Sequence, residues 1–432
     1  MGTVYVCCGG ENQVTNLQAL RHYGIRQFSD VLMLIGCSDP PTAEDQRKAI
    51  EPAKHFRKLI TQEAEDLQHQ LAIKFIQAPR DDAHRWATEL QTELGRIGLG
   101  HYLFNVTSGT RSMIFGALAA LQEAGAEDPG VTVEAIVYLA QPPRLQLLHP
   151  NIDTREILID PNDRVTFSDW IRLRGIYEQN RPAREARERN AIDRAALTAA
   201  LLAFLQDFAK TANPRQPDRA FSDAVAALHG TAQPFLDEKA PKTDQPWVRR
   251  VFSDSEKYQK QILATMISRI DDRRLSSLLK KEGNDFVFSN EDGFRYLGGG
   301  WFEELVFLHC RERLGQRPTA WNDVHLSIRV QLNAQRRDLD ADLDVIVIVD
   351  GQPHLIECKA KRFGGGVTTD DVQKLARWHH AVLGPRGRIL LLSLQPISSG
   401  HDRLSREARL NQVDLVEGPD ALSGLDRWLA GL

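Results

Sequence analysis

The sequence predicts an α/β protein with an N-terminal parallel sheet, a helical middle segment and a C-terminal α/β domain. Short β-branched runs alternate with long helical patterns over the first 140 residues, and such runs are sparse in the middle of the chain. A strongly apolar hairpin pattern lies between residues 342 and 361. From these observations we expect three domains, covering residues 1–142, 143–284 and 285–432.

Composition limits the class of protein. The chain has 432 residues, of which 42% are hydrophobic and 26% charged, and no apolar run reaches the length of a membrane span. Its five cysteines form no Cys-x-x-Cys pair, so we expect reduced core thiols in a cytoplasmic protein without a membrane partner. Because the net charge is −4, any contact with nucleic acid would need a local basic groove.

The first domain contains five runs that are typical of strands, at residues 3–8, 31–36, 73–78, 102–107 and 132–140. Helical patterns separate them, the clearest at residues 42–67 and 82–97. This alternation predicts a parallel sheet with helices on both faces. Ligands of such sheets bind beyond the carboxyl ends of the strands, where the strand order reverses.

The loops that follow these runs are rich in glycine and in short polar side chains. Backbone N–H groups of such loops at a helix N-terminus suit phosphates, although the same residues are also ordinary connectors and helix caps. The chain has no Gly-x-Gly-x-x-Gly and no Walker A lysine, which disfavours NAD and ATP. The candidate loop residues are Gly9, Gly10, Glu11, Asn12, Gln13, Ser38, Asp39, Thr107, Ser108, Gly109, Thr110 and Arg111.

The loop Thr107-Ser108-Gly109-Thr110-Arg111 resembles the Thr-Gly-Gly-Thr-Lys signature of CRISPR-associated Rossmann-fold (CARF) domains, which sense cyclic oligoadenylates. A serine replaces one glycine and an arginine replaces the lysine, so the positive charge is kept. The resemblance implies a Rossmann-like sensor in which the other candidate loops line the same pocket. Among the possible rings, cyclic tetra-adenylate is favoured over cyclic hexa-adenylate.

The middle segment, residues 143–284, is the least informative. Helical patterns lie at 168–179, 183–208 and 247–281. Loops that contain helix-breaking proline lie at 211–217 and 238–245. The last of these patterns is basic, but acidic residues are interleaved with the basic ones, as on an ordinary solvated helix face. We therefore expect a mainly helical connector that supports a dimer.

The C-terminal domain contains the hairpin pattern. A β-branched run at 345–349 is followed by a turn signal, Asp350-Gly351, and a second apolar run at 355–356. Side chains of a strand alternate between its faces, so Glu357 and Lys359 point the same way. Because burying an unpaired charge is costly, Asp344, Glu357 and Lys359 require compensation at the end of such a buried hairpin.

A divalent metal ion is one form of compensation. The carboxylates of Asp344 and Glu357 are hard oxygen ligands suited to Mg²⁺ or Mn²⁺, and Lys359 can stabilise charge that develops on a phosphate. The alternative is a solvated strand end with a cross-strand pair. The spacing resembles the PD-(D/E)XK nuclease family, in which Asp344, Glu357 and Lys359 would be the catalytic residues.

A helix is expected from Gly298-Gly299-Gly300-Trp301 to about residue 314. It carries Glu303 and Glu304 in its first turn, where the helix dipole favours carboxylates without any catalytic role. The string resembles nucleases fused to CARF domains, and in PD-(D/E)XK folds a glutamate of this helix joins the metal site. The sequence alone does not distinguish Glu303 from Glu304.

The order of the three domains resembles the CARF–nuclease effectors of type III CRISPR systems. This resemblance implies a homodimeric, metal-dependent nuclease of antiviral defence, allosterically activated by cyclic oligoadenylate, that cleaves DNA or RNA. Two alternatives stay open. One is a repair or restriction endonuclease that ignores cyclic oligoadenylate, and the other is a non-catalytic, ligand-responsive regulator.

Overall fold

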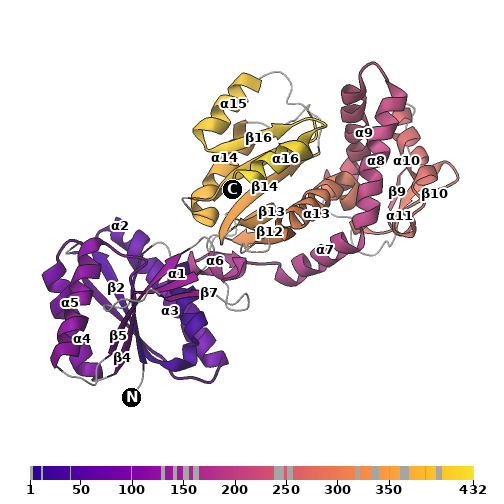
Figure 1. Ribbon diagram of the computed structural model, residues 1–432. Helices are drawn as coiled ribbons and strands as arrows, with labels where there is room; N and C mark the ends of the chain where they lie inside the picture. The colour runs from indigo at the N-terminus through magenta and orange to yellow at the C-terminus, as the bar shows by residue number, and fades with distance from the viewer. Residues whose placement is uncertain are drawn as a thin grey trace. The chain divides into compact units, whose positions relative to one another are not determined.

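The computed structural model describes residues 3–10, 13–38, 40–98, 100–127, 132–139, 144–148, 155–158, 165–237, 248–250, 256–316, 322–331, 340–349, 351–360, 369–384, 386–395 and 401–432 (Figure 1). The chain forms two compact units. The first comprises Met1–Glu178, and the second comprises Gln179–Pro318, Asn322–Val330 and Asp340–Leu432.

The first unit is built on a sheet of order β3-β2-β1-β4-β5-β6-β7. Its strands are β1 (Thr3–Cys8), β2 (Phe28–Cys37), β3 (Ala72–Pro79), β4 (His101–Asn105), β5 (Thr132–Leu139), β6 (Arg144–Leu148) and β7 (Arg155–Leu158). The first five pair in parallel, which confirms the predicted parallel sheet. β6 and β7 pair antiparallel at one edge, and the sequence analysis did not foresee them as strands.

Helices cover both faces of this sheet, as the alternating pattern predicts. α4 (Ala83–Ile97) and α5 (Arg111–Glu127) lie on one face and α3 (Glu51–Asp66) on the other (Figure 1). α1 (Val14–Tyr23) follows β1, and α2 (Ala43–Asp45) and a π-helical turn (Gln46–Ile50) precede α3. Since β1 lies between β2 and β4, the strand order reverses at β1 and β4, and the loops after these two strands share one edge of the sheet.

The segment predicted as a connector, residues 143–284, is divided between the two units. β6, β7, α6 (Phe167–Leu173) and β8 (Tyr177–Glu178) belong to the first. The second unit contains α7 (Arg181–Asp193), α8 (Ala195–Ala212), α9 (Pro217–Asp237), β9 (Val248–Arg250), α10 (Lys257–Arg269), α11 (Arg273–Leu278) and β10 (Leu279–Glu282). β9, β10 and β11 (Asp285–Phe288) form a small antiparallel sheet. The helical character is therefore confirmed from α7 onward.

The helices of the second unit share one hydrophobic core with its C-terminal sheet. Leu201, Phe204 and Leu228 of α8 and α9 belong to the same buried cluster as Val345 and Ile356 of the hairpin. Removing this much apolar surface from water is a strong stabilising contribution. The helices and the sheet consequently stabilise one another as a single folded body.

The C-terminal sheet contains, in spatial order, β12 (Asp323–Gln331), β13 (Asp340–Val349), β14 (Gln352–Lys359), β15 (Ile389–Ser393) and β16 (Val413–Glu417). β13 and β14 are the predicted antiparallel hairpin, with Gly351 at a φ of 78° in its turn. The accompanying helices are α12 (Glu291–Arg295), a π-helical turn (Tyr296–Gly300), α13 (Trp301–Gly315), α14 (Thr369–Trp378), a π-helical turn (His379–Leu383), α15 (His401–Leu410) and α16 (Ala421–Ala430). No helix in the described part of the chain has the length and apolar character needed to span a bilayer.

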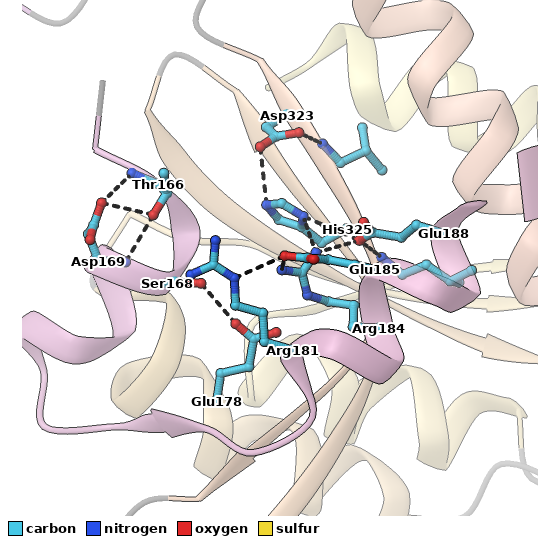
Figure 2. A network of polar contacts seen from close by, with 12 residues as sticks. Thr166, Ser168, Asp169, Glu178, Arg181, Arg184, Glu185, Glu188, Asp323 and His325 are labelled. Carbon is cyan, nitrogen blue, oxygen red and sulfur yellow. Dashed lines mark hydrogen bonds and ion pairs between the residues drawn. The ribbon is translucent and has the colours of Figure 1, made fainter. Parts of the chain in front are cut away.

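A polar network fixes α7 to β12 (Figure 2). Glu188 of α7 accepts hydrogen bonds from Arg184 Nη1 at 2.8 Å and from the backbone N–H of Leu326 at 3.1 Å. The ring of His325 lies between two carboxylates, with Nδ1 3.4 Å from Glu188 and Nε2 3.2 Å from Asp323. Burial and the Arg184 charge lower the pKa of His325, but the two carboxylates outweigh them and raise this pKa to about 9.

This network predicts a pH dependence of stability. His325 has its folded-state pKa raised from an ordinary value near 6.5, so its contribution is complete below that value and disappears as the pH rises through 9. We expect the free energy of unfolding to fall between pH 6.5 and 9 by up to about 3 kcal/mol from this group. Urea denaturation at several pH values measures it. The variant His325→Asn should show a flatter profile over this range, and identical profiles would refute the assignment.

Candidate nuclease and ligand-binding sites

The hairpin brings the three predicted nuclease residues together. Asp344 lies in the middle of β13, directly before Val345, which pairs with Ile356 of β14, and its Oδ2 accepts a 2.8 Å hydrogen bond from the backbone N–H of Cys358. Glu357 and Lys359 project from the same face of β14, and Lys359 Nζ donates to Glu357 Oε1 at 2.6 Å. The alternating geometry of a strand thus places two carboxylates and one ammonium group at one end of the sheet.

The glycine turn before α13 determines which helix glutamate reaches this end. Gly299 has a φ of 138°, which L side chains rarely adopt. After this turn Glu303 lines a cavity of about 140 Å³ together with Asp344 and Lys359. Glu304 is 2% exposed and forms a buried ion pair with Arg194, the residue between α7 and α8. Of the two glutamates that the sequence left open, the structure therefore brings Glu303 to the hairpin carboxylates.

Residues that the sequence analysis did not foresee also line the cavity: His229, Gly298, Gly299, Cys358 and Ala360. His229 comes from α9, and its Nδ1 is in hydrogen-bond contact with the carbonyl oxygen of Gly298. Because that carbonyl accepts, Nδ1 is the donor. The imidazole therefore holds the glycine turn from which α13 begins, a contact that joins residues 69 apart.

The charges in this cavity are poorly compensated. Burial raises the pKa of Asp344 well above its ordinary value, and the charges of Glu357 and Glu303 raise it further. Burial likewise raises the pKa of Glu303, against the opposing effect of the Arg187 guanidinium. Lys359 has its pKa lowered by burial but raised more by Glu357 and Asp344, so the net change is upward. The lysine is a stable cation, suited to stabilise negative charge and not to accept a proton.

The residues present fit a divalent metal ion in their chemistry. Asp344, Glu303 and Glu357 each keep one carboxylate oxygen without a hydrogen-bond partner among the described residues. Their mutual repulsion is the condition that a bound dication relieves. However, no three acidic, histidine or cysteine side chains in the described part of the chain are already arranged as a metal-binding group.

The first unit places the loops after β1 and β4 side by side. Ser108 Oγ donates to the carbonyl oxygen of Cys8 at 3.0 Å, which joins the two loops directly. A Cβ at position 109 would lie 2.6 Å from Cys8 Sγ, and Gly109 has a φ of 123°. Glycine is therefore required there both by its close approach to β1 and by its backbone conformation. Arg111 is exposed at the first residue of α5.

A buried amide network that the sequence analysis missed supports these loops. Asn105, the last residue of β4, accepts from the Thr107 hydroxyl at 2.6 Å and donates to Asn16 Oδ1 at 3.0 Å. Asn16 in turn donates to Cys8 O and to Gln13 Oε1. Gln13 is 1% exposed, and its Nε2 donates to Gly10 O at 2.6 Å. The buried side chain of Gln13 thus connects Gly10, just after β1, to Asn16 of α1.

The other candidate loop residues are distributed as follows. Ser38 donates its backbone N–H to Asp45 Oδ2 at 3.0 Å, and the backbone N–H groups of Thr42 and Ser38 lower the pKa of Asp45. Thr110 Oγ1 donates to Arg80 O at 2.8 Å, and Arg80 forms an ion pair with Asp45 at 2.7 Å. Ser38 and Thr110 thereby belong to one polar chain. Glu11, Asn12 and Asp39 lie outside the described residues.

Comparison with known proteins agrees with this arrangement. Residues 290–430 match the family model described as "Card1-like, endonuclease domain". Protein VC1899 from Vibrio cholerae has a similar fold, with a TM-score of 0.69 and 18% identity, over 99% of this chain and 97% of that one. Can2 from Sulfobacillus thermosulfidooxidans, whose structure is a complex with cyclic tetra-adenylate, is also similar, with a TM-score of 0.58 and 16% identity over 99% and 98% of the two chains. No curated protein matches the sequence.

These findings confirm the predicted fold class and the resemblance to sensor–nuclease fusions. Because residues 290–430 match a Card1-like endonuclease domain, the chain is a nuclease and not the non-catalytic regulator that the sequence left open. The similarity to VC1899 and to Can2 extends over nearly the whole chain and concerns the fold. It includes the parallel sheet of the first unit, the helices of the second and the C-terminal sheet.

The different surroundings of the two helix glutamates predict different effects on stability. Replacing Glu304 with Ala leaves the Arg194 guanidinium buried without its main partner, which should lower the free energy of unfolding by about 3–5 kcal/mol. Glu303→Gln removes a carboxylate whose charge burial disfavours, so we expect a change within about 1 kcal/mol in either direction. Urea denaturation without added metal measures both values. Equal losses in the two variants would contradict the distinction.

Proposed function

We propose that this protein is a metal-dependent nuclease of type III CRISPR defence that is activated by a cyclic oligoadenylate bound to its first unit. The observation that carries the proposal is the presence of two sites in one chain. A cavity with carboxylates and a lysine lies within an endonuclease domain, and glycine-rich loops meet at the strand-order reversal of a separate sheet. The fold similarity to Can2, whose structure contains cyclic tetra-adenylate, supports this ligand class.

In the proposed reaction, Asp344, Glu357 and Glu303 would hold Mg²⁺ or Mn²⁺, as in a PD-(D/E)XK nuclease. When bound, the ion would supply a nucleophilic water and neutralise charge on the phosphate. Lys359 stabilises the negative charge that builds on the phosphoryl oxygens. The attacking water transfers a proton to solvent and forms a P–O bond, while the opposite P–O bond breaks and its sugar oxygen takes up a proton from solvent. DNA and RNA phosphodiesters both satisfy this chemistry.

For the first unit we propose a ligand pocket formed by the loops after β1 and β4, with Ser38 and Asp39 at its edge. The hydroxyl of Thr107, the backbone of Gly9, Gly10 and Gly109, and the charge of Arg111 suit a phosphate-rich ligand. Glu11, Asn12, Gln13, Ser108 and Thr110 complete the two loops. A two-fold homodimer offers each half of a cyclic tetra-adenylate ring the same set of loops, and the ligand then shifts the population of an active dimer.

The second candidate is an endonuclease of repair or restriction that is independent of cyclic oligoadenylate. It shares the entire nuclease centre with the first candidate, since the endonuclease domain spans only residues 290–430. The two candidates differ in the role of the first unit alone. A ligand-dependence assay therefore separates them.

The decisive assay measures cleavage of labelled single-stranded DNA, RNA and supercoiled plasmid with Mn²⁺ or Mg²⁺. Each substrate is incubated without effector, with cyclic tetra-adenylate or with cyclic hexa-adenylate. We expect cleavage only with a ring present, and preferentially with the tetra-adenylate. Cleavage at the same rate without a ring would support the second candidate.

Variants separate the two sites in the same assay. Glu357→Ala and Lys359→Ala should lower the cleavage rate by at least about 100-fold, because each removes charge stabilisation of the transition state. Both should still bind the ring. Thr107→Val and Arg111→Ala should instead raise the ring concentration needed for activation and leave metal binding unchanged. A Lys359→Ala variant with the wild-type rate would contradict the assigned nuclease centre.

A further inference from the structure

Arg187 of α7 lies beside the nuclease cavity, although no sequence pattern singles it out. Its Nη2 is 3.4 Å from Glu303 Oε2, and a Cβ on Gly300 would lie 3.5 Å from the same nitrogen. The guanidinium therefore sits over the glycine turn that begins α13, next to the helix carboxylate of the cavity. Its side chain is 32% exposed, so a molecule that approaches the cavity from solvent can reach it.

The hydrogen-bonding capacity of Arg187 is only partly used. A guanidinium carries five N–H donors. Nη1 donates to Ser327 Oγ and Nη2 contacts Glu303, and these are its two partners within the described residues. Arg194, by contrast, is committed to the buried Glu304 and to Asp292. Lys359, the other cation at the cavity, is paired with Glu357.

The fold constrains the position of Arg187 from two sides. Asn180, directly before α7, donates to Ser327 O at 3.1 Å and accepts from the backbone N–H of Arg329 at 2.8 Å. The network of Glu188 and His325 also attaches α7 to β12 (Figure 2). Ser327 has a φ of 56°, an unfavourable conformation for a residue with a side chain. Its hydroxyl is the acceptor for Arg187 Nη1. Local strain retained at such a position points to a function.

We propose that Arg187 binds a phosphate oxygen of the nucleic-acid substrate at the entrance of the nuclease centre. This inference rests on the proposed function, since it names a substrate-binding residue for that reaction. A phosphodiester that enters a cavity lined by the carboxylates of Glu303 and Asp344 needs a cation that is not already neutralised. The planar fork of arginine suits phosphate, and the single 3.4 Å contact with Glu303 is longer than a strong ion pair, so a phosphate oxygen can compete for the same donor.

The alternative role for Arg187 is to hold Glu303 in place. The two roles differ in their response to salt. A phosphate contact contributes to the electrostatic part of substrate binding and steepens its dependence on salt concentration, by about 0.7 in the logarithmic slope for a single strand. A contact that only positions Glu303 leaves this slope unchanged and alters metal affinity instead.

The test uses the whole 432-residue chain with Mn²⁺ and the activating ring. It measures kcat and KM for a labelled single-stranded substrate between 50 and 200 mM salt. This range of about fourfold is wide enough to detect the loss of one phosphate contact. The variants are Arg187→Gln, Arg187→Lys and the control Arg181→Gln. Arg181 is on the same helix, is 63% exposed and pairs with Glu185. We expect Arg187→Gln to raise KM about 10-fold and to reduce the salt slope, whereas Arg187→Lys recovers part of the affinity. The control should match the wild type.

Melting temperatures and Mn²⁺ titrations of the same variants complete the test. If the wild type cleaves and Arg187→Gln has the same KM and the same salt slope, this inference is overturned and the proposed function is not. A loss of Mn²⁺ affinity with an unchanged salt slope would also overturn it, since Arg187 would then only position Glu303. A wild-type protein that cleaves no nucleic acid would overturn the proposed function, and this inference with it.

Discussion

The second unit is constrained by the mutual repulsion of three carboxylates, those of Asp344, Glu357 and Glu303, which lie beside the apolar hairpin. Burial and mutual repulsion raise the pKa of Asp344 and of Glu303, so this arrangement opposes folding. It is maintained because the surrounding apolar core is large. Val345, Ile346 and Ile356 are fully buried, and the hairpin shares its core with α8 and α9. The packing of the helices thus stabilises a unit whose buried carboxylates oppose its folding.

Three residues that are distant in sequence fix the start of α13 beside this cluster, and all of them belong to the second unit. Arg194, between α7 and α8, pairs with the buried Glu304, while Arg187 of α7 and His229 of α9 contact Glu303 and the glycine turn. The helices are therefore more than a connector. α7 is also the first helix after the unit that carries the proposed ligand pocket.

Local patterns predicted the five parallel strands of the first unit, the hairpin and the loops that follow the strands, but not β6 and β7. Long-range contacts decided the rest. β1 has the predicted bounds, and β4 ends at Asn105, two residues earlier than predicted, where the Asn105 side chain accepts from Thr107. The choice between Glu303 and Glu304 depends on Arg194, which is 110 residues away. Arg187 is one of several arginines on a highly charged helix, and only its position over Gly300 distinguishes it. No periodicity in a single sequence reports such contacts.

The central claim is that the repelling carboxylates are a metal site, and calorimetric titration with Mn²⁺ tests it most directly, without substrate or effector. The account predicts that the wild type binds Mn²⁺ and that its melting temperature rises with the ion. Asp344→Asn should lose this binding, while Glu304→Gln, whose side chain faces Arg194, should keep it if the variant is folded. Equal Mn²⁺ affinity in the wild type and in Asp344→Asn, or no binding by the folded wild type, would contradict the account.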